Sequence, residues 1–295
     1  MNTYYELLIK VNPDIADIVS EICFDNMPCE GIVMAEETRD DEIILSTTEG
    51  TLKVFLTSEC DVEAILLEHR SILKSRGFSD KELGSWEFSY LEKENEDWSK
   101  KWKEKWDITH VTDKIVVVPD WLTYDAKQTD VVIKMEPGSA FGTGTHATTQ
   151  LCMLAIEKYV KKGDTVADIG TGSGILAICA KKFGADFTYG CDIDESVIDI
   201  AKANAIKNGV DCVFELNSAD NINEKFSFVS ANILHNVLVD IMPDLINILK
   251  NDAIMVLSGI LEEKKDVVLE AINRYNLKII EQNFIGQWTS FVVRR

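Results

Sequence analysis

Short apolar runs and helical patterns alternate along the second half of the chain. Thr165 to Ile169 is an apolar run of strand length, and a helical pattern follows from Ile175 to Phe183. This alternation predicts a parallel sheet covered by helices on both faces. A short turn at Gly286 makes the final strand antiparallel. The other strands are predicted at 187–191, 212–216, 226–231, 253–257, 277–283 and 288–293, and the other helices at 150–160, 195–208, 236–249 and 261–275.

The first ninety residues follow a different order. Helical patterns begin at Pro13 and cover Val62 to Arg76, and strands are predicted at 4–11, 31–35, 43–45, 51–57 and 86–91. The order β-α-β-β-α-β is that of a ferredoxin-like sandwich. This part contains no catalytic constellation, so we interpret residues 1–92 as a recognition or assembly domain.

A charged segment, E-N-E-D-W-S-K-K-W-K-E-K-W, connects the two halves. Trp98, Trp102 and Trp106 recur every four residues, which places all three indoles on one face of a helix. We predict a linker helix over 93–110 whose tryptophan stripe either docks on a domain or partner, or packs permanently into the second domain. The second domain then covers 111–295 and begins with a hairpin, Lys114 to Pro119 and Asp130 to Met135.

The chain is strongly acidic, with a formal net charge of −20 over 295 residues. This charge argues against general affinity for nucleic acid, whose phosphates it would repel. Residues 1–90 contain 19 acidic and 7 basic residues, a net charge of −12. The acidity indicates either a basic protein partner or a contribution to solubility alone.

Other features of the composition narrow the class of protein. No apolar run approaches the ~18 residues of a membrane span, and the start has no signal-peptide pattern, so we expect a cytoplasmic protein. None of the seven scattered cysteines forms a C-x-x-C pair and the four histidines lie far apart, so the sequence indicates no metal site. Nothing requires more than a monomer.

The stretch T-V-A-D-I-G-T-G-S-G, residues 165–174, carries the strongest chemical signal. Gly170 and Gly172 remove side chains at the end of a predicted strand, so a ligand can contact the backbone there. The pattern G-x-G-x-G is one residue shorter than a dinucleotide motif, which disfavours a pyrophosphate. Asp192 ends the next strand 22 positions after Gly170, where an acid reaches ribose hydroxyls. An adenosine without pyrophosphate fits, as in the class I S-adenosylmethionine-dependent methyltransferases that this region resembles. The alternative is a tight turn with Asp192 capping the next helix.

The loop E-P-G-S-A-F-G-T-G-T-H-A-T-T, residues 136–149, precedes a predicted helix and the main strand. Polar loops this close to a site are usually functional. We interpret Thr149 as a hydrogen-bond partner of the cofactor's amino-acid end and Phe141 as an apolar wall. Alternatively, Thr148 and Thr149 cap the helix. The role of His146 stays open, since a lone histidine is more often structural than a base.

Five motifs together make a closer resemblance. They are P-G-S-A-F-G-T-G-T-H-A-T-T (137–149), D-I-G-T-G-S-G-I-L-A-I (168–178), D-I-D (192–194), A-N-I-L (231–234) and S-G-I-L (258–261). Over the whole chain, this set resembles the ribosomal protein L-eleven methyltransferase family. The departures are modest: Ser139 and Ala147 fill variable positions, and Asn251-Asp252 replaces a Gly-Gly turn.

The resemblance implies a fold and a reaction. The fold is an α/β class I methyltransferase Rossmann-like sheet of seven strands, the last antiparallel, behind a ferredoxin-like α+β domain and a helical linker. The reaction is methyl transfer from S-adenosyl-L-methionine to lysine ε-amino groups and the N-terminal α-amino group of that basic ribosomal protein. By motif, the cofactor contacts fall on Thr149, Gly170, Asp192 and Asn232, and Gly172 belongs to the same glycine turn.

Methyl transfer to an amine requires alignment and a neutral nucleophile. A free lysine has a pKa of ~10.4, so the site must favour the uncharged form. Phe141 and Trp288 are the candidate walls of an apolar vestibule. Asn232 can accept an N–H bond from the amine without adding charge, or it can serve only as a helix N-cap.

Three other functions fit the sequence less well. Methyltransferases that act on a glutamine amide usually carry N-P-P-Y, where this chain has N-I-L-H at 232–235. A nicotinamide dehydrogenase would need the longer glycine motif. A non-catalytic binding module would lose the site, whereas Asp192, Asn232 and the loop are all present.

Overall fold

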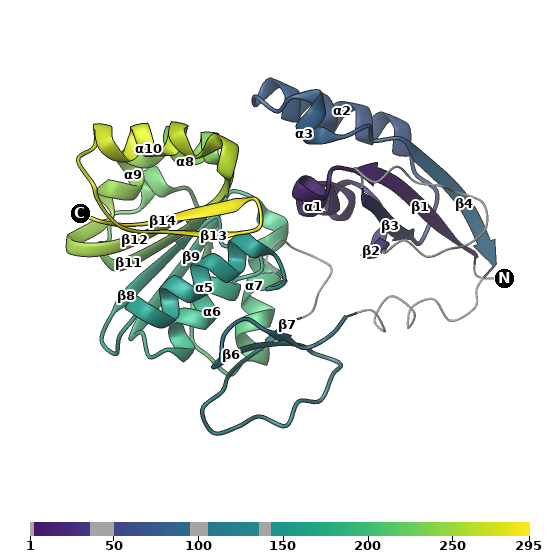
Figure 1. Cartoon of the computed structure of the whole chain (residues 1–295). Coiled ribbons are helices and arrows are strands. Elements are labelled where there is room, and N and C mark those ends of the chain that lie inside the picture. Colours follow the sequence, from purple (N-terminus) through teal and green to yellow (C-terminus); the bar gives the residue numbers. More distant parts are fainter. Residues whose placement is uncertain (1–2, 36–49, 95–105, 136–142) are drawn as a thin grey trace. The chain divides into compact units, whose positions relative to one another are not determined.

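The chain divides into two compact units, Met1–Asp107 and Ile108–Arg295. The computed structural model describes residues 3–35, 50–94, 106–135 and 143–295 (Figure 1). The predicted linker helix lies largely outside the described residues, as do Trp98, Trp102, Phe141 and the strand predicted at 43–45. The domain boundaries at residues 92 and 111 therefore stay predictions.

The first unit is a four-stranded antiparallel sheet with two main helices. Its strands lie in the order β2-β3-β1-β4, which is the arrangement of a ferredoxin-like fold. Along β1, Leu7, Ile9 and Val11 are fully buried while the residues between them are partly exposed, as expected for a strand covered on one face. The elements are β1 (Thr3–Val11), η1 (Pro13–Ile15), α1 (Ala16–Asn26), β2 (Cys29–Ala35), β3 (Gly50–Leu56), α2 (Val62–Ser75), α3 (Asp80–Leu83) and β4 (Phe88–Glu94).

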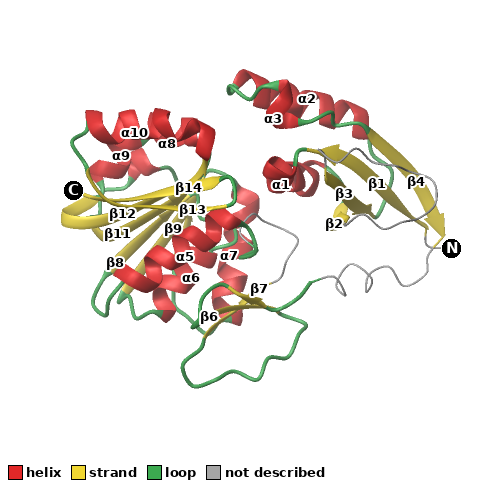
Figure 2. Cartoon of the chain, in the orientation of Figure 1, coloured by secondary structure: helices red, strands yellow, loops and turns green. Residues whose placement is uncertain are grey.

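The second unit is built on a seven-stranded sheet in the order β10-β9-β8-β11-β12-β14-β13 (Figure 2). Neighbours from β10 to β12 pair in parallel, and β14 runs antiparallel to both β12 and β13. The predicted antiparallel last strand is thus confirmed. The strands are β8 (Thr165–Ile169), β9 (Phe187–Asp192), β10 (Val213–Leu216), β11 (Phe226–Asn232), β12 (Leu249–Leu261), β13 (Lys278–Ile285) and β14 (Trp288–Arg294).

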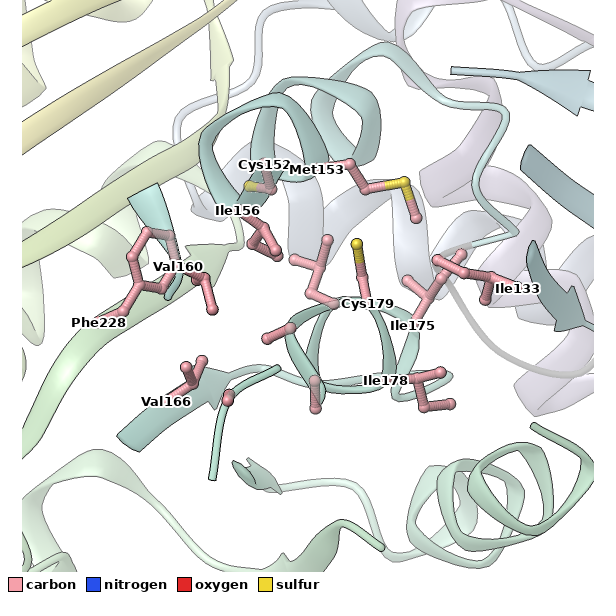
Figure 3. Packing of buried hydrophobic residues seen from close by; sticks show 14 of the residues in the cluster. Ile133, Cys152, Met153, Ile156, Val160, Val166, Ile175, Ile178, Cys179 and Phe228 are labelled. Atoms are coloured by element: carbon pink, nitrogen blue, oxygen red, sulfur yellow. The ribbon is translucent and has the colours of Figure 1, made fainter. Parts of the chain in front are cut away.

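Helices cover both faces of this sheet (Figure 1). Because side chains alternate along a strand, Val166 of β8 belongs to the buried cluster that includes residues of α5, α6 and α7, whereas Ala167 belongs to the cluster that includes residues of α8, α9 and α10. Figure 3 shows Val166 in one buried cluster with Ile156 of α5 and Cys179 of α6. The helices are α5 (Ala147–Tyr159), α6 (Ile175–Lys182), α7 (Glu195–Lys207), η3 (Ala219–Asn221), α8 (His235–Asp240), α9 (Met242–Asn247), η4 (Glu262–Lys264) and α10 (Lys265–Arg274).

Two local predictions were wrong. The segments predicted as a hairpin are β6 (Ile115–Pro119) and β7 (Val131–Met135), which pair in parallel, with β5 (Thr109–His110) antiparallel to β6. Parallel neighbours need a crossover, and residues 120–130 supply it as a loop (Figure 2). The single helix predicted at 236–249 is split into α8 and α9 at Ile241, since Pro243 suits only the first turn of a helix.

Candidate active site

The glycine turn follows directly from β8, at the carboxyl edge of the parallel strands. Gly170 has a φ of +71°, and its N–H donates to the carbonyl of Cys191 at 2.9 Å. A Cβ built at Gly170 would lie 2.3 Å from Cγ2 of Ile233, so a larger residue fits only if the Ile233 side chain moves. The turn thus brings the ends of β8, β9 and β11 together.

Asp192 ends β9 beside this turn. Its carboxylate accepts hydrogen bonds from the N–H of Gly172 at 2.9 Å and from the N–H of Asp194 at 3.2 Å. Burial raises the pKa of Asp192, and the backbone donors oppose that rise. Asp194, not Asp192, caps α7, through the N–H of Ser196 at 2.8 Å. The alternative role of Asp192 as a helix cap is therefore wrong.

Ile193 is a candidate site residue that was not predicted from the sequence. It stands between Asp192 and Asp194, and 81% of its surface is exposed. A β-branched apolar side chain gains nothing from water contact, so its place beside a carboxylate and a glycine turn suits the face of a flat apolar ligand group. The motif D-I-D already contained this apolar residue between two acids.

Asp168 was also missed as a site component. It is 1% exposed, and its carboxylate accepts hydrogen bonds from the hydroxyls of Thr171 and Ser230, both at 2.8 Å, and from the N–H of Ala177. Burial raises the pKa of Asp168 to about 7, although the three hydrogen bonds favour the charged form. Through Asp168, this network connects Thr171 of the glycine turn to Ser230 of β11 and Ala177 of α6, and so holds the turn in place. An acid within the apolar strand V-A-D-I was the available signal.

Thr149 and Asn232 lie side by side. The Asn232 amide nitrogen donates to the Thr149 hydroxyl oxygen at 3.4 Å, and both side chains are buried. Asn232 Oδ1 has no hydrogen-bond partner among the described residues. A buried acceptor without a partner is costly, so this oxygen suits a donor supplied by a ligand.

The helix-cap alternatives for these residues are wrong. Helix α5 begins at Ala147 with His146 as its N-cap, so Thr148 and Thr149 lie inside its first turn. Helix α8 begins at His235 with Leu234 as its N-cap, so Asn232 lies outside it. Helix capping therefore accounts neither for Thr148 and Thr149 nor for Asn232.

His146 and Trp288 form a second contact at the start of α5. Their rings meet edge to face with centroids 4.9 Å apart, and His146 Nδ1 lies 2.7 Å from the Thr148 hydroxyl. Trp288, at the start of β14, is buried against Leu151 and Leu261. His146 thus has a packing role, whereas Phe141 lies outside the described residues and its predicted role stays untested.

The cofactor residues predicted from the sequence, Thr149, Gly170, Gly172, Asp192 and Asn232, therefore form one connected group. Thr149 contacts Asn232, Ile233 directly after β11 lies against Gly170, and the N–H of Gly172 donates to Asp192. No group of three potential metal ligands occurs within the described ranges. In the same part of the chain, no helix is both long and apolar enough to cross a membrane.

The family model described as Ribosomal protein L11 methyltransferase (PrmA) matches residues 3–295. The chain belongs to the ribosomal protein L11 methyltransferase family. The enzyme class, the S-adenosyl-L-methionine cofactor and the fold predicted from the sequence are thereby confirmed. Membership favours this function over the dehydrogenase, the binding module and the glutamine-amide methyltransferase considered above.

Individual relatives agree with the family match. A ribosomal protein L11 methyltransferase of Alkaliphilus oremlandii is 39% identical over 264 residues, covering 87% of this chain and 84% of the relative. The ribosomal protein L11 methyltransferase of Dictyoglomus turgidum is 33% identical over 300 residues, covering 99% of this chain and 98% of the relative. The crystal structure of a ribosomal protein L11 methylase from Lactobacillus delbrueckii subsp. bulgaricus is 34% identical, with a TM-score of 0.62, covering 64% of this methyltransferase and 99% of that chain.

Proposed function

We propose that this methyltransferase moves methyl groups from S-adenosyl-L-methionine to lysine ε-amino groups and the N-terminal α-amino group of ribosomal protein L11. The observation that carries the proposal is the connected group of Thr149, Asn232, Gly170, Gly172 and Asp192 at the carboxyl edge of a methyltransferase sheet. Ligands of open α/β sheets bind at this edge.

The residues at the edge fit the chemistry of the cofactor. The Asp192 carboxylate accepts backbone hydrogen bonds from Gly172, Ile193 and Asp194 and still has a lone pair available for a ribose hydroxyl. Ile193 offers its exposed side chain to the adenine face. Thr149 and Asn232 offer a hydroxyl and an unpartnered amide oxygen to the polar amino-acid end or to the acceptor amine.

The bound cofactor would supply an electrophilic methyl group on a sulfonium, so the protein contributes position and solvent exclusion. Asn232 Oδ1 accepts an N–H of the acceptor amine and directs its lone pair. Because an amide oxygen carries no net charge, it orients the amine and favours the ammonium form much less than a carboxylate would. The amine must arrive neutral, and the proton it releases after transfer leaves to solvent.

The substrate side of the proposal rests on charge. A ribosomal protein that binds RNA is basic, and the first ninety residues of this enzyme have a net charge of −12. Opposite charges speed encounter and orient the partner. We therefore assign substrate recognition to residues 1–92. We also propose that the enzyme acts as a monomer in the cytoplasm, with no direct contact to nucleic acid.

Two substitutions separate cofactor binding from chemistry. Asp192→Ala should weaken cofactor binding by about 10- to 100-fold, because it removes hydrogen bonds of a charged acceptor. Asn232→Ala should lower turnover more than cofactor affinity. Calorimetry with the cofactor and a methylation assay on L11 measure both quantities. Equal losses of affinity and turnover in the Asn232 variant would refute its role with the amine.

A further inference from the structure

Strand β12 leaves its regular register at Ser258 and Gly259, directly beside Asn232. Ser258 is the parallel partner of Asn232 on β11, and the pairing of β12 with β14 shifts between Leu257 and Ile260. Irregularities of this kind re-aim the chain next to active sites. The two residues belong to the motif S-G-I-L, to which the reaction described so far assigns no role.

Gly259 allows the backbone after Asn232 to approach β12 closely. Its φ is +82°, and an added Cβ would lie 2.3 Å from the carbonyl oxygen and 3.0 Å from the nitrogen of Ile233. On its other side, Ile233 meets Gly170, where a Cβ would lie 2.3 Å from its Cγ2. Ile233 thus lies close to two glycines, with its side chain against Gly170 and its backbone against Gly259.

Ser258 fixes the neighbouring segment. Its hydroxyl donates to the carbonyl oxygen of Thr148 at 3.0 Å, and both residues are buried. Thr148 precedes Thr149, whose hydroxyl accepts from the Asn232 amide. Two consecutive residues of β12 therefore hold the two backbone segments that carry Thr149 and Asn232.

We propose that Ser258 and Gly259 are positioning residues for methyl transfer, which set where Asn232 Oδ1 stands relative to Thr149 and the acceptor amine. The inference rests on the proposed function of Asn232. In Gly259→Ala, the Ile233 carbonyl must retreat by about 1 Å, because ordinary contacts begin at 3.4 Å. A misplacement of about 1 Å costs up to about 100-fold in rate, so we expect turnover to fall by about 10- to 100-fold.

The test compares Gly259→Ala with Gly163→Ala. Gly163 has a similar φ of +94° but nothing within 4 Å of an added Cβ, so its variant carries the backbone strain without the displacement. Three quantities are measured on each full-length protein: turnover on L11, cofactor affinity by calorimetry, and the NMR signals of the Asn232 side-chain amide.

The proposal expects Gly259→Ala to shift the Asn232 amide signals and to lower turnover more than cofactor affinity, while Gly163→Ala does neither. Unmoved Asn232 signals, or equal losses of turnover in both variants, would overturn it. If the wild-type enzyme does not methylate L11, the proposed function fails, whereas the NMR comparison still decides whether Gly259 positions Asn232.

Ser258→Ala keeps the backbone of β12 and covers the case in which Gly259→Ala does not fold. It removes the hydroxyl that holds Thr148, so Asn232 signals should shift and turnover should fall by about three- to tenfold. Wild-type signals and wild-type turnover in Ser258→Ala, with Gly259→Ala unfolded, would count against the proposal.

Discussion

The buried carboxyl of Asp168 makes the stability of the catalytic unit depend on pH. Its pKa rises from 3.8 to about 7 through burial. Because folding raises this pKa, the folded state binds a proton more tightly than the unfolded state does. The resulting stabilisation is complete below the unfolded pKa and is lost as pH rises through the folded pKa. The shift of about 3 units corresponds to about 4 kcal/mol in total at 1.36 kcal/mol per unit.

Asp168→Asn removes this titration and keeps the shape of the side chain. Between pH 5.5 and pH 8, which avoids the acidic pI of about 4.6, wild type should lose about 2 kcal/mol relative to the variant. Hydrogen exchange of the β8 amides of Val166 and Ala167 measures the free energy of opening of this unit at each pH. The free energy of opening of Asp168→Asn should therefore increase relative to that of wild type as pH rises.

A charge control is needed because the whole chain is acidic. Asp186→Asn removes the same charge from an exposed position of the same unit. If Asp168→Asn and wild type keep a constant difference in opening free energy across the range, or if Asp186→Asn reproduces the gain, the Asp168 carboxyl does not carry the pH dependence.

Three further outcomes are expected. Gly170→Ala should lose about 1–3 kcal/mol more stability in thermal unfolding than Gly209→Ala, because both have positive φ but only Gly170 has a close neighbour; equal losses would contradict this. Ile193→Asn should raise the cofactor Kd about tenfold with an unchanged Tm, and a wild-type Kd would exclude Ile193 from the adenine contact. Added salt should raise KM for L11 far more than the cofactor Kd, and a salt-independent KM would exclude steering by the acidic first unit.

The sequence could predict the elements whose hydrophobic period is clear. The β8 and β14 strands and the α6 and α7 helices lie within one or two residues of their predicted positions, since their buried faces repeat every two or about four residues. The pairing of β6 with β7 could not be predicted, because two short apolar strands joined by a polar loop look alike whether they run parallel or antiparallel.

Strand β12 shows why tertiary contacts escaped prediction. Asn251-Asp252 looks like a turn before a five-residue strand, yet β12 runs from Leu249 to Leu261 and accommodates Asp252 at a φ of +60°. The pairing of β12 with β11 passes from Leu249 directly to Ile254, and the pairing with β14 begins at Ile254, so the turn-like residue Asp252 lies in an irregular part of the strand. Sequence spacing likewise could not place Gly259 against Ile233, because their contact joins strands far apart in the chain.

The site residues that could be predicted from the sequence are those that suit a ligand by residue type and also stand at the end of a predicted strand. Gly170, Asp192 and Asn232 each follow or end a predicted parallel strand, so their meeting at one edge followed from the topology. The contacts of Asp168 and the exposure of Ile193 depend on neighbours from other elements, and only the structure supplies them.

The central claim is that the edge formed by β8, β9 and β11 holds S-adenosyl-L-methionine and directs its methyl group to amines of L11. The most direct test is mass spectrometry of L11 after incubation with wild-type enzyme and methyl-labelled cofactor. We expect label on lysine side chains and on the N-terminal amine, and about 5- to 50-fold slower labelling with Asp192→Ala at a cofactor concentration near the wild-type Kd, because binding weakened about 10- to 100-fold leaves only about 1–10% of the variant loaded. Unlabelled L11 with the folded wild-type enzyme, or label confined to other side chains, would contradict the account.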